Sequence, residues 1–391
     1  MSAGATPPGV FLKVASVSYE GSIFGWDVAP DAESQDAGLQ TTLSFGFHCS
    51  AGSLRALAVS ASGKYMCCGG MDERIHVFDV ESKRAVGEIT GHTGAVTCLC
   101  FIGDTNLLSG SEDTTICIWR VYDWQCLHIL GGHKAGVNGI GVHPSGKLAL
   151  TVSKDSLLKT WNLVHGRCAF TRRLKKPADR VLWHADGQYY LLVMDSELQL
   201  FNSEDNNTCV VSCSFGNRIN QAVFCNTASG NDAASSCIAV VCENKMLHIV
   251  ELTGTKVTGD GVDLSSVLEN GRPRDMWSCK PAAVGSAEMQ EIIREEGDCL
   301  AIVTSNGLLV VLSCRAVCQQ VAEEQAAGAD IADAVLSSMQ ITAQPRLTAL
   351  TAWVPVTKPS KKKERKEKDD VVEKVEDKKK RKVKFAEAED S

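Results

Sequence analysis

Short apolar runs recur along most of this chain, and each run ends at residues typical of tight turns. The stretches RIHVF and TTICIW alternate or run apolar and are rich in β-branched side chains. Runs of this length and composition predict β-strands rather than helices. Glycine, serine, asparagine and aspartate separate the runs, which indicates short connections between neighbouring strands. The pattern therefore favours an all-β fold.

The strand pattern repeats about every forty residues. Leu107–Trp119 reads LLSGSEDTTICIW and aligns without gaps with Ala149–Trp161, which reads ALTVSKDSLLKTW. A Gly-His pair precedes each of the two segments. The histidines of the two pairs, His92 and His133, are 41 residues apart. Further upstream, YMCCGGMDERIHVFDV repeats the pattern with Phe78 at the tryptophan position. A repeat of this length is typical of one blade of a β-propeller.

Each of the two clear repeats carries a hydroxyl residue, a histidine, an aspartate and a tryptophan at matching positions. When the strands fold back, the indole N–H can donate to the hydroxyl, the hydroxyl to the histidine, and the histidine to the aspartate. Each buried polar group gains a partner, whereas an unpartnered one would cost about 1–3 kcal/mol. The predicted structural hydrogen-bond chains are His92, Ser109, Asp113 and Trp119 in one repeat, and His133, Thr151, Asp155 and Trp161 in the next.

Two features resemble catalytic or nucleotide-binding motifs. Closely spaced serine, histidine and aspartate would suit a hydrolase, but the set recurs once per repeat, whereas an enzyme needs one nucleophile in one cleft. The segment GVHPSGKL, Gly141–Leu148, nearly matches a phosphate-binding loop. Leu148, however, lacks the hydroxyl that binds magnesium, and the segment falls at a strand–strand turn. We therefore expect no catalytic residues and no cofactor-binding site.

Counting the strand runs gives six complete blades and an incomplete piece at each end. Phe11–Val28 supplies two strands, and Arg346–Val354 supplies at least one. Pairing these pieces completes a seventh blade and removes the sheet edges that unpaired strands would expose. The predicted fold is an all-β, seven-bladed β-propeller over residues 10–356, closed by pairing of the N- and C-terminal strands.

Three segments are longer than a blade requires: residues 203–236, 254–296 and 315–344. We expect them to project as loops, or to form short helices in SAEMQEIIREE and in AVCQQVAEEQAAGADIADAVLSSM. The apolar residues of the second stretch fall at imperfect helical spacing: Val317, Val321, Ile331, Val335 and Met339. Insertions of this kind serve either as solvated loops or as docking surfaces for a partner.

Composition sets further limits. Hydrophobic residues make up 44% of the chain, but no run approaches the roughly 20 apolar residues that span a bilayer. The first residues, MSAGATPPGV, lack the basic start and apolar run of a secretory signal, so we expect an intracellular protein without a membrane partner. The 17 cysteines are scattered through apolar runs, without any C-x-x-C pair. We expect them to act as small hydrophobes and to form no metal site.

Charge is unevenly distributed. Residues 358–391 hold 14 Lys and Arg against 10 Asp and Glu, which leaves a net charge of −11 on residues 1–357 within the total of −7. An acidic body suits basic protein partners and repels phosphate overall. The tail has few apolar residues, so we expect residues 357–391 to be disordered, together with residues 1–9.

With the blades placed, the chain resembles the p21-activated-kinase-interacting protein family, whose members are nucleolar WD-repeat factors for large ribosomal subunit assembly. The resemblance rests on VASVSYEGSIFGWDV, GSEDTTICIW, HPSGKLALTVSKDSLLKTWNLVHGRCAF, PRLTALTAW and the lysine-rich tail. The sequence departs from the pattern at the Trp-Asp pair, because Trp119 is followed by Arg120 and Trp161 by Asn162.

The resemblance implies a non-catalytic scaffold without cofactors that helps large-subunit precursors mature in the nucleolus and nucleus. The implied partners are pre-ribosomal particle proteins of the large subunit, with the chain acting as a monomer within a larger complex. The alternative that it implies is a signalling adaptor that binds and negatively regulates a p21-activated kinase.

The tail carries two short motifs. KKKRKV resembles a nuclear import signal, in which Lys378, Lys379, Lys380, Arg381 and Lys382 lie extended in an acidic importin groove. The same run can instead contact pre-rRNA, can do both, or can simply be solvated. KVKF also resembles the docking motif for protein phosphatase type one, with Val383 and Phe385 filling two apolar pockets.

Overall fold

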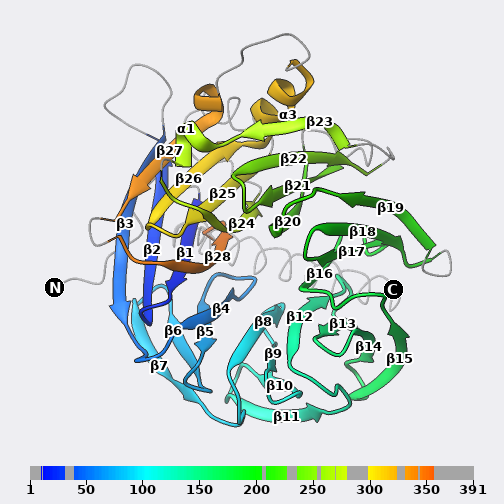
Figure 1. Ribbon diagram of the computed structural model, residues 1–391. Coiled ribbons are helices and arrows are strands. Elements are labelled where there is room, and N and C mark those ends of the chain that lie inside the picture. Colours follow the sequence, from blue (N-terminus) through cyan, green and yellow to red (C-terminus); the bar gives the residue numbers. More distant parts are fainter. Residues whose placement is uncertain are drawn as a thin grey trace, which may run out of the picture. The chain divides into compact units, whose positions relative to one another are not determined.

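The computed structural model describes residues 10, 12–30, 39–204, 208–226, 236–252, 257–268, 270–279, 298–323, 331–341 and 344–355. Seven four-stranded antiparallel sheets follow one another around a ring (Figure 1). The ring lies within the first of the two units into which the chain divides, Met1–Pro355. The predicted all-β fold with seven blades is confirmed.

Blades 2 to 4 each use four consecutive strands, ordered from the centre of the ring outward. Blade 2 contains β4 (Leu54–Val59), β5 (Tyr65–Gly70), β6 (Ile75–Asp79) and β7 (Arg84–Ile89). Blade 3 contains β8 (Val96–Ile102), β9 (Asn106–Ser111), β10 (Ile116–Arg120) and β11 (Gln125–Leu130). Blade 4 contains β12 (Val137–Val142), β13 (Leu148–Ser153), β14 (Leu157–Asn162) and β15 (Arg167–Arg173).

Blades 5 to 7 continue the same order, with short helices added near blades 6 and 7. Blade 5 contains β16 (Arg180–Trp183), β17 (Tyr189–Met194), β18 (Glu197–Asn202) and β19 (Thr208–Ser214). Blade 6 contains β20 (Ile219–Asn226), β21 (Ser236–Cys242), β22 (Met246–Glu251) and β23 (Val257–Asp263), and α1 (Ser265–Leu268) follows. Blade 7 contains β24 (Pro273–Cys279), β25 (Cys299–Thr304), β26 (Leu308–Ser313) and β27 (Val335–Gln340). Between β26 and β27 lie α3 (Cys314–Glu323) and a 3-10 helix (Ile331–Ala334).

Blade 1 joins the two ends of the propeller. Its innermost strand is β28 (Leu347–Trp353), followed outward by β1 (Leu12–Ser18), β2 (Ser22–Pro30) and β3 (Leu39–His48). The predicted closure by N- and C-terminal strands is confirmed, but the N-terminal segment supplies three strands rather than the expected two. The missed strand is β3, the outermost strand of the blade. Its residues are all at least partly exposed, and its sequence, LQTTLSFGFH, therefore needs no continuous apolar run that would predict a strand.

Backbone pairing between β1 and β28 closes the ring. The register runs from Lys13 opposite Trp353 to Ser18 opposite Leu347, with one irregularity at the end. Beyond the strand end, the Arg346 guanidinium lies 2.7 Å from the Glu20 carboxylate. This pairing leaves blade 1 with the same four-stranded sheet as every other blade.

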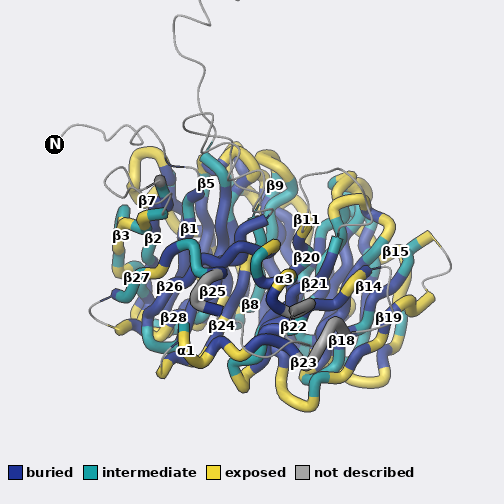
Figure 2. The backbone as a smooth tube through the Cα atoms, turned by 90° about the horizontal axis from the view of Figure 1, so that it is seen from above, coloured by how far each residue is buried: buried dark blue, intermediate teal, exposed yellow. Residues whose placement is uncertain are grey.

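The hydrophobic core consists of seven clusters, one between each pair of neighbouring blades. Successive residues of a strand point to opposite faces, so a single strand contributes to two clusters. On β9, for example, Leu107 packs toward blade 2 and Leu108 packs toward blade 4. Buried residues follow the middle of the strands, and many exposed residues lie in the turns at both ends (Figure 2).

The expectation that the three long segments project as loops was wrong for most of their described residues. Strands β19 and β23 lie within two of these segments and complete blades 5 and 6, whereas the runs NQAVFCN and RPRDMWSC, which the blade count includes, are confirmed as strands β20 and β24. The expected helix in residues 316–339 ends early, because Val335 and Met339 belong to β27, which covers the outer edge of β26. The SAEMQEIIREE stretch lies outside the described residues.

Helix α3 is part of the core rather than a solvated insertion. Cys314, Val317 and Cys318, spaced as on one helical face, pack into the cluster between blades 6 and 7. Arg315 and Gln319 lie on the opposite, exposed side. The helix contacts β23 of blade 6, as Figure 1 shows. Neither α3 nor any other helix among the described residues is long and apolar enough to cross a membrane.

We predict that the propeller requires β28. A chain that ends at Pro345 lacks this strand and exposes the inner edge of β1. Its free energy of unfolding should fall by about 5 kcal/mol or more, because the loss of one buried leucine side chain already costs about 2–5 kcal/mol. Urea unfolding followed by tryptophan fluorescence measures the change. A chain that ends at Pro355 is the matched control and should unfold like the full chain; equal stability of both shortened chains would contradict the prediction.

Candidate functional site

The four predicted side chains of blade 3 form one continuous hydrogen-bond chain. Trp119 Nε1 donates to Ser109 Oγ at 2.7 Å, and Ser109 Oγ lies 2.7 Å from His92 Nε2. His92 Nδ1 lies 2.8 Å from Asp113 Oδ2. Strands β9 and β10 position the serine and the tryptophan, whereas the histidine and the aspartate come from the loops at the same end of the blade. The chain therefore connects two strands to two loops.

The direction of each bond follows from the groups at the two ends of this chain. The ionised Asp113 carboxylate only accepts, so His92 Nδ1 must carry the proton and donate. His92 Nε2 is then the acceptor for the Ser109 hydroxyl, whose oxygen in turn accepts from the Trp119 indole. Each of the three bonds that link the four side chains then has one donor and one acceptor.

Blade 4 repeats the arrangement with a threonine in place of the serine. Trp161 Nε1 donates to Thr151 Oγ1 at 2.8 Å, and Thr151 Oγ1 lies 2.8 Å from His133 Nε2. His133 Nδ1 lies 3.0 Å from Asp155 Oδ2. In both blades the aspartate also accepts from the backbone N–H of the residue after the histidine, Thr93 or Lys134. This additional bond fixes the loop that carries the histidine.

These contacts shift the pKa values of the ionisable members. Burial raises the pKa of Asp113, but hydrogen bonds from Thr115, the Thr93 amide and His92 outweigh burial and lower it to about 2. Burial also raises the pKa of Asp155, but hydrogen bonds from the Lys134 amide and from His133 outweigh burial and lower it below its ordinary value. At His133, burial lowers the pKa and outweighs the raising effect of Asp155. Both carboxylates are therefore held in the charged form and His133 is held neutral.

The other blades replace this chain with different contacts. In blade 2, strand register places Cys68 at the serine position and Phe78 at the tryptophan position, and both pack into the apolar cluster beside blade 1. His76, on β6, supplies the histidine of this blade, and its Nε2 lies 2.6 Å from Asp72 Oδ2. In blade 6 the same register places two valines, Val240 and Val250, at the serine and tryptophan positions.

The geometry of the hydrogen-bond chains differs from that of a hydrolase site in one decisive respect. Ser109 and Thr151 are completely buried, and each hydroxyl oxygen already accepts an indole N–H. A nucleophilic oxygen must instead reach a substrate and face donors for the developing oxyanion. Gly141–Leu148, the second motif considered, spans the turn between β12 and β13, and β13 follows it directly.

Asp275 was not predicted as a site residue, yet it links several blades near the centre of the ring. Its carboxylate accepts from Gln221 Nε2 of blade 6 at 2.7 Å and from the Leu350 amide of blade 1 at 2.8 Å. Arg180 of blade 5 lies 3.9 Å away. Burial raises the pKa of Asp275 despite these contacts. The sequence PRDMW does not predict that its aspartate links blades, because the groups that Asp275 binds, Gln221 and Leu350, lie on strands far away in the sequence.

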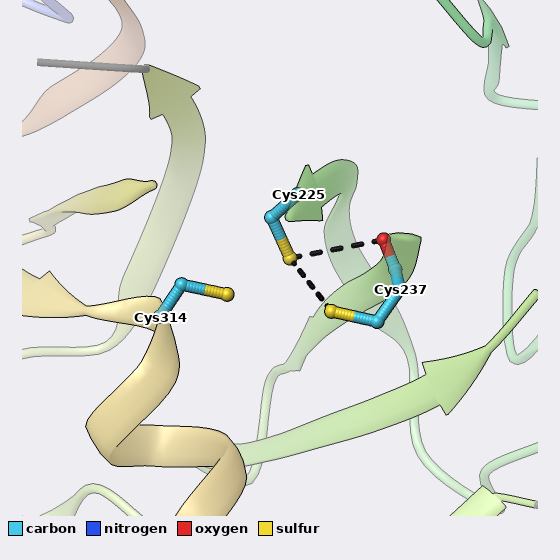
Figure 3. Close-up of side chains that lie close together, drawn as sticks. All are labelled: Cys225, Cys237 and Cys314. Atoms are coloured by element: carbon cyan, nitrogen blue, oxygen red, sulfur yellow. Dashed lines mark hydrogen bonds between the residues drawn. The ribbon is translucent and has the colours of Figure 1, made fainter. Parts of the chain in front are cut away.

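A second feature that sequence reasoning missed is a group of buried thiols, which we call the thiol cluster: Cys225, Cys237, Cys314 and Cys318. The first two face each other across β20 and β21 with their Sγ atoms 3.2 Å apart, and Cys314 lies at the start of α3 (Figure 3). Hydrogen bonds from Cys225, Cys314 and Cys318 lower the pKa of Cys237 below its ordinary value. The sequence did not predict this cluster, because its cysteines are far apart along the chain or separated by three residues and form no C-x-x-C pair.

Large apolar side chains are exposed on what we call the rim of blades 3 and 4. Strands β11 and β15 are the outermost strands of these blades, and Tyr122 and Val164 lie in the turns that precede them. The exposed fractions are 93% for Tyr122, 65% for Ile129, 64% for Val164, 55% for Phe170 and 41% for Leu127. Beside them on blade 4, Arg167, Arg173 and Lys175 are exposed. The rim therefore combines apolar and cationic groups on a body of net negative charge.

The predicted motifs of the tail lie outside the described residues. This applies to the import signal, Lys378–Lys382, and to the phosphatase-docking pair, Val383 and Phe385. Both stay predictions from the sequence.

We predict that Ser109→Ala destabilises the propeller by about 2–4 kcal/mol, because it leaves His92 and Trp119 each with a buried polar atom unpartnered. Urea unfolding measures the loss. Thr93→Ala, at an exposed position of the same blade, is the matched control and should cost less than about 0.5 kcal/mol. In a Trp119→Phe background, Ser109→Ala should cost less than it does in the wild type. Equal costs in both backgrounds would show that the bonds are not coupled.

A second prediction concerns acid. The folded-state pKa of Asp113, about 2, lies below its ordinary value of 3.8, so its contribution to stability is complete only well above pH 3.8 and is lost as the pH falls through 3.8 toward 2. The difference in unfolding free energy between the wild type and Asp113→Asn should therefore be constant above about pH 4.5 and shrink below it. Denaturant titrations at several pH values measure this difference, and parallel curves down to pH 2.5 would contradict the prediction.

Comparison with known proteins shows where the repeats fall relative to the blades. The family model described as WD domain, G-beta repeat matches residues 40–79, 83–120 and 124–162. Each match begins with the outermost strand of one blade and ends with the third strand of the next, as β3 with β4 to β6. A single sequence repeat therefore joins two neighbouring blades.

Two groups of relatives are similar to the chain. A p21-activated protein kinase-interacting protein 1-like protein of Danio rerio is 34% identical over 256 residues, and one of Xenopus laevis is 35% identical over 267 residues. These matches cover 66% and 63% of this chain, and 66% and 70% of the two relatives.

Two further relatives match shorter stretches. Protein MAK11 of Saccharomyces cerevisiae is 33% identical over 182 residues, which are 42% of this chain and 44% of that protein. A U3 snoRNP-associated protein-like protein of Arabidopsis thaliana, EMB2271, is 31% identical over 159 residues, 38% of this chain and 33% of that protein. The closed seven-bladed ring, the WD-domain repeats and the extent of the vertebrate matches lead to one conclusion: the chain belongs to the p21-activated protein kinase-interacting protein 1-like family of WD-repeat proteins.

Proposed function

We propose that this protein is a non-catalytic WD-repeat scaffold that helps to assemble and mature the large ribosomal subunit precursor in the nucleolus. The observation that carries the proposal is kinship with this family, together with a relative whose name associates it with U3 snoRNP, a small nucleolar ribonucleoprotein. WD40 propellers typically act as scaffolds that bind other proteins. The proposed partners are proteins of the pre-ribosomal particle, with the chain a monomer within that larger complex.

The rim of blades 3 and 4 supports this role. Tyr122, Ile129 and Phe170 expose large apolar surfaces on the blades that also contain the two complete hydrogen-bond chains. A binding surface on a rigid element loses little conformational freedom when a partner binds. The neighbouring cations, Arg173 and Lys175, suit a particle that contains RNA as well as protein. We therefore propose this rim as the face toward the precursor particle.

Delivery to the nucleus is assigned to the basic run of the tail. Five consecutive cations, Lys378–Lys382, can each reach a separate carboxylate of an importin groove. The same run can contact pre-rRNA once the protein is inside the nucleus. Docking of a type-one phosphatase through Val383 and Phe385 remains a separate proposal.

A second candidate function is that of a signalling adaptor that binds and restrains a p21-activated kinase. The names of the vertebrate relatives favour it, because they describe those proteins as interacting with such a kinase. A propeller can present surfaces to two partners, so the same fold serves either role. The two functions differ in the process that fails when the protein is absent.

We predict that depletion of this protein causes late large-subunit precursor rRNAs to accumulate, because their particle lacks a component needed for maturation. Blotting of precursor rRNA and sedimentation of ribosomal subunits measure this effect. A resupplied wild-type chain should restore maturation. A chain with Lys378–Lys382 changed to alanine should remain outside the nucleus and fail to do so. Fusing an unrelated import signal to that variant should restore both its location and maturation.

The tail offers a matched control. Alanine at Lys361, Lys362 and Lys363 removes another run of three cations and should leave location and maturation unchanged. Normal precursor rRNA after depletion, accompanied by altered activity of a p21-activated kinase, would refute the assembly role and favour the adaptor.

A further inference from the structure

The four cysteines of the thiol cluster come from three separate elements of blades 6 and 7. Cys225 and Cys237 are directly opposite each other on β20 and β21, while Cys314 and Cys318 are one turn apart on α3. The Sγ atoms of Cys225, Cys237 and Cys314 all lie within 4.8 Å of one another. The fourth thiol, Cys318, lies one helical turn beyond Cys314 on α3 and is partly buried against the same cluster. Three sulfurs thus lie together between the sheet and the helix, as Figure 3 shows, and Cys318 is the nearest further cysteine along α3.

This arrangement fits a tetrahedral metal ion. Zinc binds thiolates at about 2.3 Å, which places the sulfurs of a four-cysteine site about 3.8 Å apart. The observed separations, 3.2 Å for one pair and below 4.8 Å for the three, bracket that value. Sulfur-only ligand sets select zinc over metals that prefer oxygen. Small side-chain rotations are therefore enough to bring these three sulfurs to bonding distance, and a change of rotamer at Cys318 would supply the fourth ligand.

The surroundings also favour bound thiolates. Cys225, Cys237 and Cys314 are buried in an apolar cluster, which is a closed environment of the kind that structural zinc sites require. The first residue of α3 is Cys314, so the partial positive charge at the helix N-terminus lies beside the sulfurs. Zinc binding would release the thiol protons to solvent and leave two net negative charges, which this helix end partly offsets.

We propose that Cys225, Cys237, Cys314 and Cys318 bind one zinc ion that joins α3 of blade 7 to the sheet of blade 6. This part of the ring lacks the hydrogen-bond chains of blades 3 and 4. At the corresponding positions of blade 7, which face blade 6, strand register places Ile302 and Leu312. A metal ion would hold the same pair of blades by a different chemistry. The proposal is independent of the role in ribosome assembly.

The test starts from the zinc content of the full chain, purified without chelators and without a metal-binding tag. Elemental analysis should find about one zinc ion per chain, and X-ray absorption should show sulfur ligands at about 2.3 Å. Cobalt substitution should give the sulfur-to-metal charge-transfer and visible bands of a tetrahedral thiolate site. Cys314→Ser should lower the affinity for zinc at least about tenfold.

Cys242→Ser is the matched control. Cys242 is buried on the same strand as Cys237 but faces blade 5, so this variant should keep its zinc. Two results on the unaltered chain would overturn the proposal whether or not the variants fold: no zinc bound after incubation with the metal, or a disulfide between Cys225 and Cys237. Zinc that persists in Cys314→Ser and Cys237→Ser would overturn it as well, because the metal would then lie elsewhere.

Discussion

The whole propeller depends on the pairing of two strands from opposite ends of the chain. Without β28, the ring would have one blade with an exposed inner edge and would lose a strand that contributes to two of the seven apolar clusters. Closure removes that edge and makes every blade a neighbour of two others. Because each strand sends alternate side chains to two clusters, a local defect in one blade affects both of its neighbours.

The contacts that reinforce this ring differ around its circumference. Blades 3 and 4 hold their loops by directed hydrogen bonds that end on ionised aspartates, and blade 2 keeps only a shorter version through His76 and Asp72. Blades 6 and 7 have aliphatic residues at the serine and tryptophan positions, and α3 packs into the cluster between these two blades. Polar chains specify one loop geometry, whereas aliphatic packing tolerates variation. The more regular blades are accordingly those that the family model matches.

The repeat positions allowed prediction of the two hydrogen-bond chains, because residues 41 or 42 apart take equivalent places in successive blades. The closing strands could also be predicted, since unpaired edges are unfavourable. The strand β3 was missed because an outermost strand is half-exposed and lacks an apolar pattern. The thiol cluster could not be predicted, because Cys225 and Cys314 are 89 residues apart and meet only through the packing of two blades. The repeat period predicts the contacts within one repeat. Contacts between different blades form only when the ring is complete, so the period does not reveal them.

Burial explains why the same three residue types that hydrolyse substrates in other folds do not indicate catalysis here. In a hydrolase the hydroxyl oxygen faces a cleft, and the histidine receives its proton during the reaction. In this propeller the oxygen of Ser109 is enclosed and already accepts from Trp119, so a proton shift toward His92 would leave a buried alkoxide that no substrate can reach. The arrangement therefore favours the resting state over any charged intermediate. That property suits a structural link in a scaffold, whose function depends on the surfaces that the ring holds in place.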